Sequence, residues 1–178
     1  MKEVKNNTIQ ALIGLGNPGS KHYYQRHNIG FRVLDVLADT YGASWHTKGE
    51  AEQTSITING HIIVLIKPQT FMNTSGRVIP SLIKQGIKAE SIAVVHDELE
   101  LPFGQVKYKL GGSHKGHNGL RSIIGVCGAD FVRIRCGIGR PANKDDVPDY
   151  VLQRFTESEQ DIESMIQSAV GMIESFFK

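Results

Sequence analysis

Apolar and polar positions recur along the chain with the periods of strands and helices. Residues 8–15 form an apolar run that ends at glycines and predicts a first strand. Residues 28–41 carry apolar side chains at helical spacing. Residues 54–66 are typical of a hairpin, because Asn59-Gly60 between two apolar runs is a strong signal for a tight turn.

The second half of the chain continues this alternation. Residues 74–85 predict a helix, and the apolar run 92–95 predicts a strand in the centre of a sheet. Two more strands are expected over residues 104–110 and 131–138. The pattern favours an α/β fold, a single domain over residues 1–178 with a mixed, twisted sheet flanked by helices. The helix over 74–85 should bury four apolar side chains, namely Val78, Ile79, Leu82 and Ile83.

The final helix is predicted to begin near Thr156, because Thr156 and Glu159 have the spacing of a capping box. One face of this helix is apolar and should pack onto the core. Its members are Ile162, Met165, Ile166, Ala169, Val170, Ile173 and Phe177.

Composition narrows the class of protein. A chain of 178 residues with 40% hydrophobic and 21% charged residues is an ordinary globular domain, not a disordered one. The net charge is only +2, so binding to nucleic acid would need a local basic patch. Cys127 and Cys136 are too few for a disulfide framework, and we expect reduced, largely buried thiols. Without an apolar stretch of signal-peptide or membrane-span length, the expected location is the cytoplasm.

Ligands of α/β proteins gather at the carboxyl ends of strands, which makes the segments after each strand informative. The first strand is followed by residues 14–19, Gly-Leu-Gly-Asn-Pro-Gly, which match the glycine pattern of dinucleotide-binding turns. Pro18 stiffens this turn, and Asp35 falls inside a predicted helix, so nucleotide binding is the weaker alternative. We expect the glycines to let the backbone approach a ligand and to hold Asn17 at a strand end.

Other strand ends carry polar side chains that are ambiguous one by one. His27 could be a surface or capping residue, and Asn73 could cap a helix. Asp97 ends a buried strand, where a carboxylate can orient a histidine. His114 and His117 lie in a glycine-rich loop without a cysteine or carboxylate cluster, so no metal is expected. The chain lacks a Gly-x-Ser-x-Gly elbow, which favours water over serine as the nucleophile of a hydrolase.

Six short motifs taken together resemble the bacterial peptidyl-tRNA hydrolases. Their order and spacing span nearly the whole chain, at residues 14–19, 26–30, 67–76, 96–99, 116–120 and 133–141. The resemblance implies a monomeric α/β esterase that needs no metal or cofactor. Its substrate would be peptidyl-tRNA, cleaved at the ester to the terminal ribose to release a free peptide and a reusable tRNA.

The resemblance also implies roles for particular residues. His27 would be the catalytic histidine and Asp97 the acid that orients it. Lys109 and Arg135 would hold the 5′ phosphate of the tRNA. The other matching positions would bind substrate or water, namely Asn17, Met72, Asn73, Asn118 and His117. A slot that is often tyrosine in the family is occupied by His22, so Tyr23 or Tyr24 is the candidate for that role.

The chemistry is consistent on its own terms. A histidine titrates near neutral pH and suits general-base catalysis with water. An asparagine amide can stabilise the oxyanion, and either Asn73 or Asn17 could supply it. Within strands, Lys107 and Lys109 share a face, as do Arg133 and Arg135, which could form a phosphate-binding stripe. The rival hypotheses are a nucleotide-dependent enzyme and a non-catalytic RNA-binding module.

Overall fold

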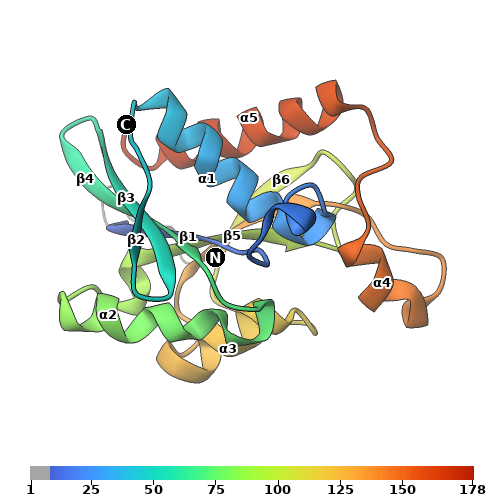
Figure 1. Cartoon of the computed structure of the whole chain (residues 1–178), viewed down its shortest axis with the longest axis horizontal. Helices are drawn as coiled ribbons and strands as arrows, with labels where there is room; N and C mark the ends of the chain where they lie inside the picture. Colours follow the sequence, from blue (N-terminus) through green and yellow to red (C-terminus); the bar gives the residue numbers. More distant parts are fainter. Residues whose placement is uncertain (1–8) are drawn as a thin grey trace.

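A seven-stranded mixed sheet forms the middle layer of the protein in a computed structural model, which describes residues 9–178 (Figure 1). The strands are β1 (Ala11–Gly14), β2 (His46–Lys48), β3 (Ala51–Ile58), β4 (His61–Pro68), β5 (Ile92–Glu98), β6 (Val106–Leu110) and β7 (Val132–Gly137). Their order across the sheet is β2-β3-β4-β1-β5-β7-β6. The four inner strands β4, β1, β5 and β7 run parallel, whereas β2, β3 and β6 pair antiparallel with their neighbours. The predicted mixed sheet is therefore confirmed, and Thr8 of the expected first strand lies outside the described residues.

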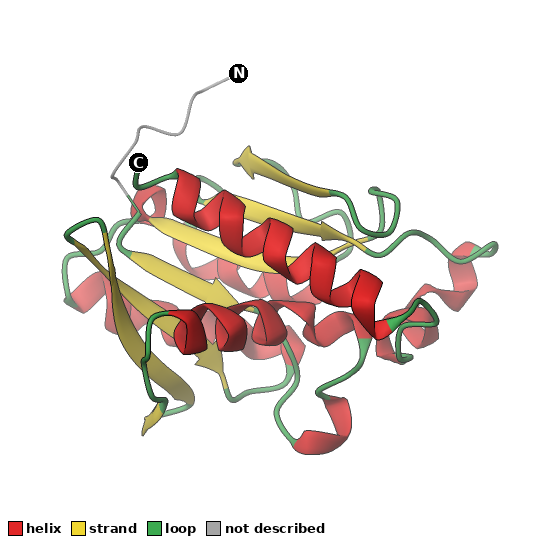
Figure 2. Cartoon of the chain, turned by 90° about the horizontal axis from the view of Figure 1, so that it is seen from above, coloured by secondary structure: helices red, strands yellow, loops and turns green. Residues whose placement is uncertain are grey.

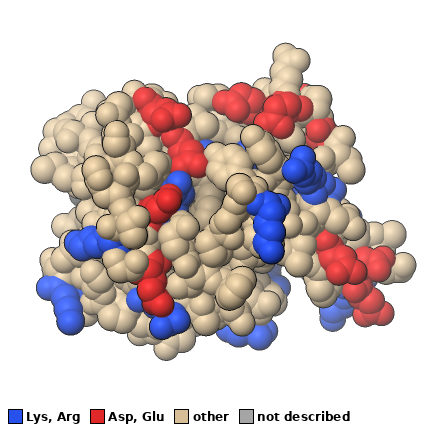
Figure 3. All heavy atoms as spheres, in the orientation of Figure 1, with Lys and Arg blue, Asp and Glu red and all other residues tan. Residues whose placement is uncertain are grey.

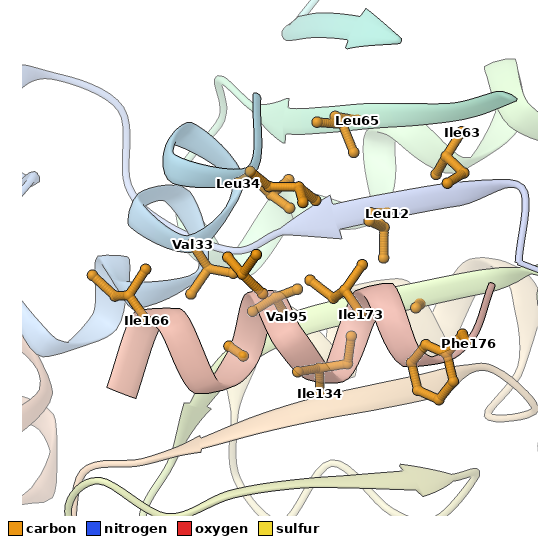
Figure 4. Packing of buried hydrophobic residues seen from close by; sticks show 14 of the residues in the cluster. Leu12, Val33, Leu34, Ile63, Leu65, Val95, Ile134, Ile166, Ile173 and Phe176 are labelled. Atoms are coloured by element: carbon orange, nitrogen blue, oxygen red, sulfur yellow. The ribbon is translucent and has the colours of Figure 1, made fainter. Parts of the chain in front are cut away.

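Helices cover both faces of this sheet (Figure 2). Helices α1 (Ile29–Thr40) and α5 (Glu159–Ser175) pack on one face, and α2 (Ile79–Lys84) and α3 (Asn118–Cys127) pack on the other. Side chains of β1 alternate accordingly, with Leu12 facing α1 and α5 (Figure 4) and Ile13 facing the opposite cluster. Because the central strands are covered on both sides, they read as continuous apolar runs.

The hairpin is confirmed and is longer than predicted. Strands β3 and β4 pair antiparallel from Ala51 opposite Pro68 to Ile58 opposite His61. The turn residues Asn59 and Gly60 both have positive φ, 48° and 84°. Two consecutive positive φ angles are what a two-residue hairpin turn requires, and asparagine and glycine tolerate them best.

The helix expected over residues 74–85 is wrong in its extent. A 3₁₀ segment, η3 (Met72–Val78), comes first, and α2 begins only at Ile79. Pro80 explains the break, because proline fits the first turn of a helix but not its interior. Val78, Ile79 and Leu82 are buried as predicted, whereas Ile83 is 51% exposed and the prediction for it is wrong.

The final helix begins two residues later than a cap at Thr156 predicts. Its cap is Ser158, whose hydroxyl accepts a hydrogen bond from the Asp161 amide at 3.1 Å, and not Thr156. The pattern Ser/Thr-x-x-Asp/Glu occurs twice here in overlapping positions, at 156–159 and 158–161, and sequence spacing could not choose between the two. All seven side chains of the predicted apolar face are buried. Among residues 9–178, no helix is both long and apolar enough to cross a membrane.

Candidate active site

A cavity of about 260 Å³ opens at the carboxyl ends of β5 and β7. It draws residues from four separate parts of the chain: the segment before α1, the end of β5, the loop before α3, and the β6–β7 pair. A short helix, α4 (Val147–Leu152), supplies a further part of the wall. Seven predicted site residues line this cavity, namely His27, Asp97, Lys109, His117, Asn118, Arg133 and Arg135.

Asp97 lies at the centre of a three-residue hydrogen-bonded cluster. His27 Nδ1 is 2.8 Å from Asp97 Oδ2, and His117 Nε2 is 2.8 Å from Asp97 Oδ1. Burial by itself would raise the pKa of Asp97, but the charges and hydrogen bonds of the two histidines hold this pKa well below its usual value. The carboxylate is therefore ionised and accepts hydrogen bonds from both rings.

The tautomers of both histidines follow from these contacts. His117 caps α3, because its Nδ1 accepts from the amides of Gly119 and Leu120 at 3.1 and 3.4 Å. Its hydrogen is therefore on Nε2, which donates to Asp97. His27 donates from Nδ1 to the same carboxylate, which leaves the lone pair of its Nε2 free to accept a proton in the cavity.

The same cluster contains the ligand atoms for a metal ion, within 4.8 Å of one another. A metal on His117 Nε2 would require the hydrogen of a neutral ring to sit on Nδ1. That hydrogen would then face the amide donors of Gly119 and Leu120 and break the cap of α3. The donor set therefore fits a proton-sharing cluster better than a metal centre.

Asn17 is buried and held rigidly at the end of β1. Its backbone amide and carbonyl both bond to the side chain of Asn28, at 3.0 and 2.8 Å. Its Oδ1 accepts from the Met72 amide at 2.8 Å, so the Nδ2 group is the part of the side chain left for a ligand. Met72 packs near the central cluster, because a Cβ at Gly119 would lie 2.5 Å from Met72 Sδ and 3.2 Å from the His117 ring. Asn17 bonds to the Met72 amide and is therefore linked to this contact through Met72.

Two glycines of the first turn, Gly14 and Gly16, are required for helix packing. A Cβ at Gly14 would lie 2.5 Å from the Gly30 carbonyl oxygen, and one at Gly16 would lie 2.8 Å from the Phe31 ring. Both glycines therefore allow α1 to pack closely against β1. The spacing of these two glycines therefore has a packing explanation that requires no bound nucleotide.

Three predicted substrate residues, Asn17, Met72 and Asn73, are not among the residues that line the cavity. Asn73 is exposed beside Met72, and Phe71 rather than Asn73 precedes the η3 segment as its cap. The Tyr23 hydroxyl donates to Asp35 at 2.8 Å, and Tyr24 lies near Arg32. Both tyrosines lie outside the wall of the cavity that holds His27.

The basic residues of β6 and β7 share one face of the sheet. Lys107 is opposite Arg135, and Lys109 is opposite Arg133. Arg133 is buried, and its guanidinium donates to the carbonyl oxygens of Ser113 and Gly112, so it holds the glycine-rich loop in place.

Both lysines remain exposed on this face, whereas Arg135 donates from Nε to Glu98 Oε1 at 2.7 Å. Figure 3 shows acidic and basic side chains interspersed on the face it presents, in keeping with the small net charge. A phosphate-binding surface on this protein would therefore have to be local.

The cavity also contains residues that were not predicted from the sequence, among them His96 and Glu98 on either side of Asp97. Glu98 pairs with Arg135. His96 is fully buried, and burial followed by the charge of His117 lowers its pKa to about 4. Strand alternation gave no signal for either, because it places them on the opposite face of the sheet from Asp97, yet all three residues line the cavity at the end of β5.

The cysteines do not suit nucleophilic catalysis. Both cysteines of the described chain are free, with Cys136 buried and Cys127 partly buried. Burial, with a smaller contribution from Asp97, raises the pKa of Cys136 to about 12, and burial raises the pKa of Cys127. The expected reduced thiols are confirmed, although Cys127 is less buried than predicted.

Comparisons with known proteins agree with this geometry. Residues 11–178 match the family model described as peptidyl-tRNA hydrolase. The chain is 46% identical to the peptidyl-tRNA hydrolase of Sulfurovum sp. (strain NBC37-1) over 89% of this chain and 84% of that protein, and 42% identical to that of Aliarcobacter butzleri over 94% and 91%. The crystal structure of the Acinetobacter baumannii peptidyl-tRNA hydrolase superposes with a TM-score of 0.85 at 37% identity, covering 96% of this chain and 87% of that one. The chain belongs to the peptidyl-tRNA hydrolase family.

Proposed function

We propose that this protein hydrolyses the ester between tRNA and a peptide or N-blocked aminoacyl group, with His27 as the general base. The observation that carries the proposal is the 2.8 Å hydrogen bond from His27 Nδ1 to the buried carboxylate of Asp97. Water attacks the ester carbonyl and gives a proton to His27 Nε2, and the imidazolium is stabilised by the negative charge of Asp97. The protonated ring then supplies a proton to the departing ribose oxygen. The products are a free peptide and a reusable tRNA.

Asn17 is the better candidate for the oxyanion donor. Its side chain is held by the Met72 amide and its backbone by Asn28, whereas Asn73 is exposed and has no comparable support in the described chain. A donor that is positioned before the reaction stabilises the transition state without a reorganisation cost. Asn118 lines the cavity beside His117 and would hold the attacking water or a peptide carbonyl.

The tRNA would bind across the basic face of β6 and β7. Lys107 and Lys109 are exposed there and are suited to phosphate contacts. Arg135 would add a guanidinium whose terminal nitrogens are not used by the bond from Nε to Glu98. Arg133 would act indirectly, by holding the glycine-rich loop. A monomer in the cytoplasm, without cofactor or metal, is part of the proposal.

The test is release of a labelled N-acylated amino acid from its tRNA in the presence of a chelator. The intact protein should turn over, and His27→Ala should lower kcat by about 10²–10⁴-fold, the usual contribution of a general base. His46→Ala on the exposed strand β2 is the matched control and should retain activity. Binding of the labelled tRNA without release by the intact protein would instead favour the RNA-binding module.

A further inference from the structure

We propose that Arg26 is a positioning residue that holds helix α4 in place as a wall of the active-site cavity. Arg26 directly precedes His27 in the chain, and the residue is 3% exposed. The proposal rests on the assigned hydrolase function, because it identifies what keeps the substrate cavity closed on one side.

Helix α4 forms part of the cavity wall without a core of its own. Val147, Pro148 and Val151 line the cavity that also contains His27. Residues 144–152, all of them described, include no buried side chain. Burial of apolar side chains is what normally fixes a short helix, because an isolated helix of six residues is not stable in water. Some other interaction must therefore position α4.

The contacts of Arg26 supply that interaction. Its Nη1 donates to the Tyr150 carbonyl oxygen at 2.9 Å and to Gln153 Oε1 at 3.4 Å. Its guanidinium carbon lies 3.8 Å from the centre of the Tyr150 ring, and its backbone amide bonds to the Gln153 carbonyl at 3.0 Å. The buried guanidinium of Arg26 thus donates to a carbonyl oxygen at the carboxyl end of α4 and stacks on the ring of Tyr150 in the same helix.

A second anchor completes the attachment. The Tyr150 hydroxyl donates to the Ile138 carbonyl oxygen at 2.6 Å, just beyond the end of β7. Tyr150 therefore lies between Arg26 and the strand that carries Arg135. Through this residue the position of α4 is linked both to the segment that holds His27 and to the basic side of the cavity.

The decisive measurement is hydrogen exchange of residues 143–154 in the free protein, with KM and kcat measured on the same samples. Arg26→Met should accelerate exchange in this segment about tenfold or more and leave β5 unchanged. It should raise KM about tenfold with kcat within about threefold, because the bond between His27 and Asp97 does not involve the guanidinium. Tyr150→Phe, which removes one hydroxyl, should accelerate exchange in the same segment to a smaller degree.

Arg32→Met is the matched control, because Arg32 is also a buried arginine but pairs with Glu159 of α5. It should lower thermal stability without faster exchange in residues 143–154. The proposal is overturned if Arg26→Met leaves exchange of this segment unchanged, accelerates exchange uniformly along the chain, or lowers kcat with KM unchanged. Exchange is measured without substrate, so its result is independent of the proposed function, which the turnover of the intact protein tests.

Discussion

Replacement of Asp97 by asparagine is the most informative perturbation of this site, because the carboxylate serves two histidines at once. An amide can accept a hydrogen bond with its oxygen but must donate with its nitrogen. In Asp97→Asn, one of the rings of His27 and His117 will therefore face an N–H donor and must turn a lone pair towards it. Which ring changes its tautomer depends on the hydrogen bonds that each change would break elsewhere.

The structure predicts that His27 will yield. If His117 changed tautomer, its Nδ1 hydrogen would face the Gly119 and Leu120 amides and the cap of α3 would be lost. Loss of a helix cap costs about 0.5–2 kcal/mol, and an unsatisfied buried donor adds about 1–3 kcal/mol. Together these costs amount to about 1.5–5 kcal/mol, and the middle of that range, about 2–4 kcal/mol, corresponds to roughly 30- to 700-fold at about 1.4 kcal/mol per factor of ten. The new amide group should thus point its nitrogen at His27 Nδ1 and leave the hydrogen of the ring on Nε2. With that hydrogen in place, Nε2 cannot accept a proton from water.

We expect Asp97→Asn to lower kcat by about 10³–10⁴-fold, since the negative charge that stabilises the imidazolium is lost as well. The corresponding change in the serine-protease triad costs about 10⁴-fold through the wrong tautomer. The assay is release of a labelled N-acylated amino acid from its tRNA, in single turnover.

A double-mutant cycle with His117→Ala tests the reasoning. His117→Ala removes the α3 cap in both members of the comparison, so the amide oxygen of the Asp97→Asn side chain can turn towards His27 at no further cost to that cap. The loss caused by Asp97→Asn should then shrink to about 10–100-fold, because the cap-dependent bias of roughly 30- to 700-fold no longer acts. An equal loss in both backgrounds, or a loss below tenfold in the single variant, would refute the tautomer argument.

Four further predictions concern stability and substrate binding. His96 has a pKa lowered from 6.5 to about 4, so its neutral form favours folding above pH 6.5 and stability is lost as the pH falls towards 4. His96→Phe should reduce this acid-dependent loss by roughly 3 kcal/mol in pH-dependent denaturant unfolding, and an unchanged slope would contradict the assignment. Gly171→Ala in α5 meets no neighbour within 4 Å and should stabilise the protein by about 0.5–1 kcal/mol. Gly30→Ala places a Cβ 2.4 Å from the Val95 carbonyl oxygen and should destabilise by about 1–3 kcal/mol or more, as thermal unfolding would show. Lys109→Gln should raise KM and lower the slope of log KM against log salt by about 1, the amount expected for the loss of one phosphate contact. An unaltered slope would count against that contact.

Much of the architecture could be predicted from local patterns. Short continuous apolar runs identified the central strands. Asn59-Gly60 identified the hairpin turn, because such turns depend on backbone conformations that few residues adopt. The spacing of apolar residues from Ile162 to Phe177 identified the buried face of α5. Segment ends were less certain, since two overlapping capping patterns competed before α5 and Pro80 divided the expected helix.

The sequence by itself determined the α/β class and the set of motifs that resemble the peptidyl-tRNA hydrolases. Only the tertiary structure decided how these motifs work together, because His27 and Asp97 are 70 residues apart and meet only when α1 packs onto the sheet. It also assigned Gly14 and Gly16 to helix packing, gave His117 its tautomer, and showed that Arg133 is bonded to the glycine-rich loop. Each of these outcomes depends on which atoms meet across the fold, as packed neighbours or as donor and acceptor. The order of residues along the chain does not specify those contacts.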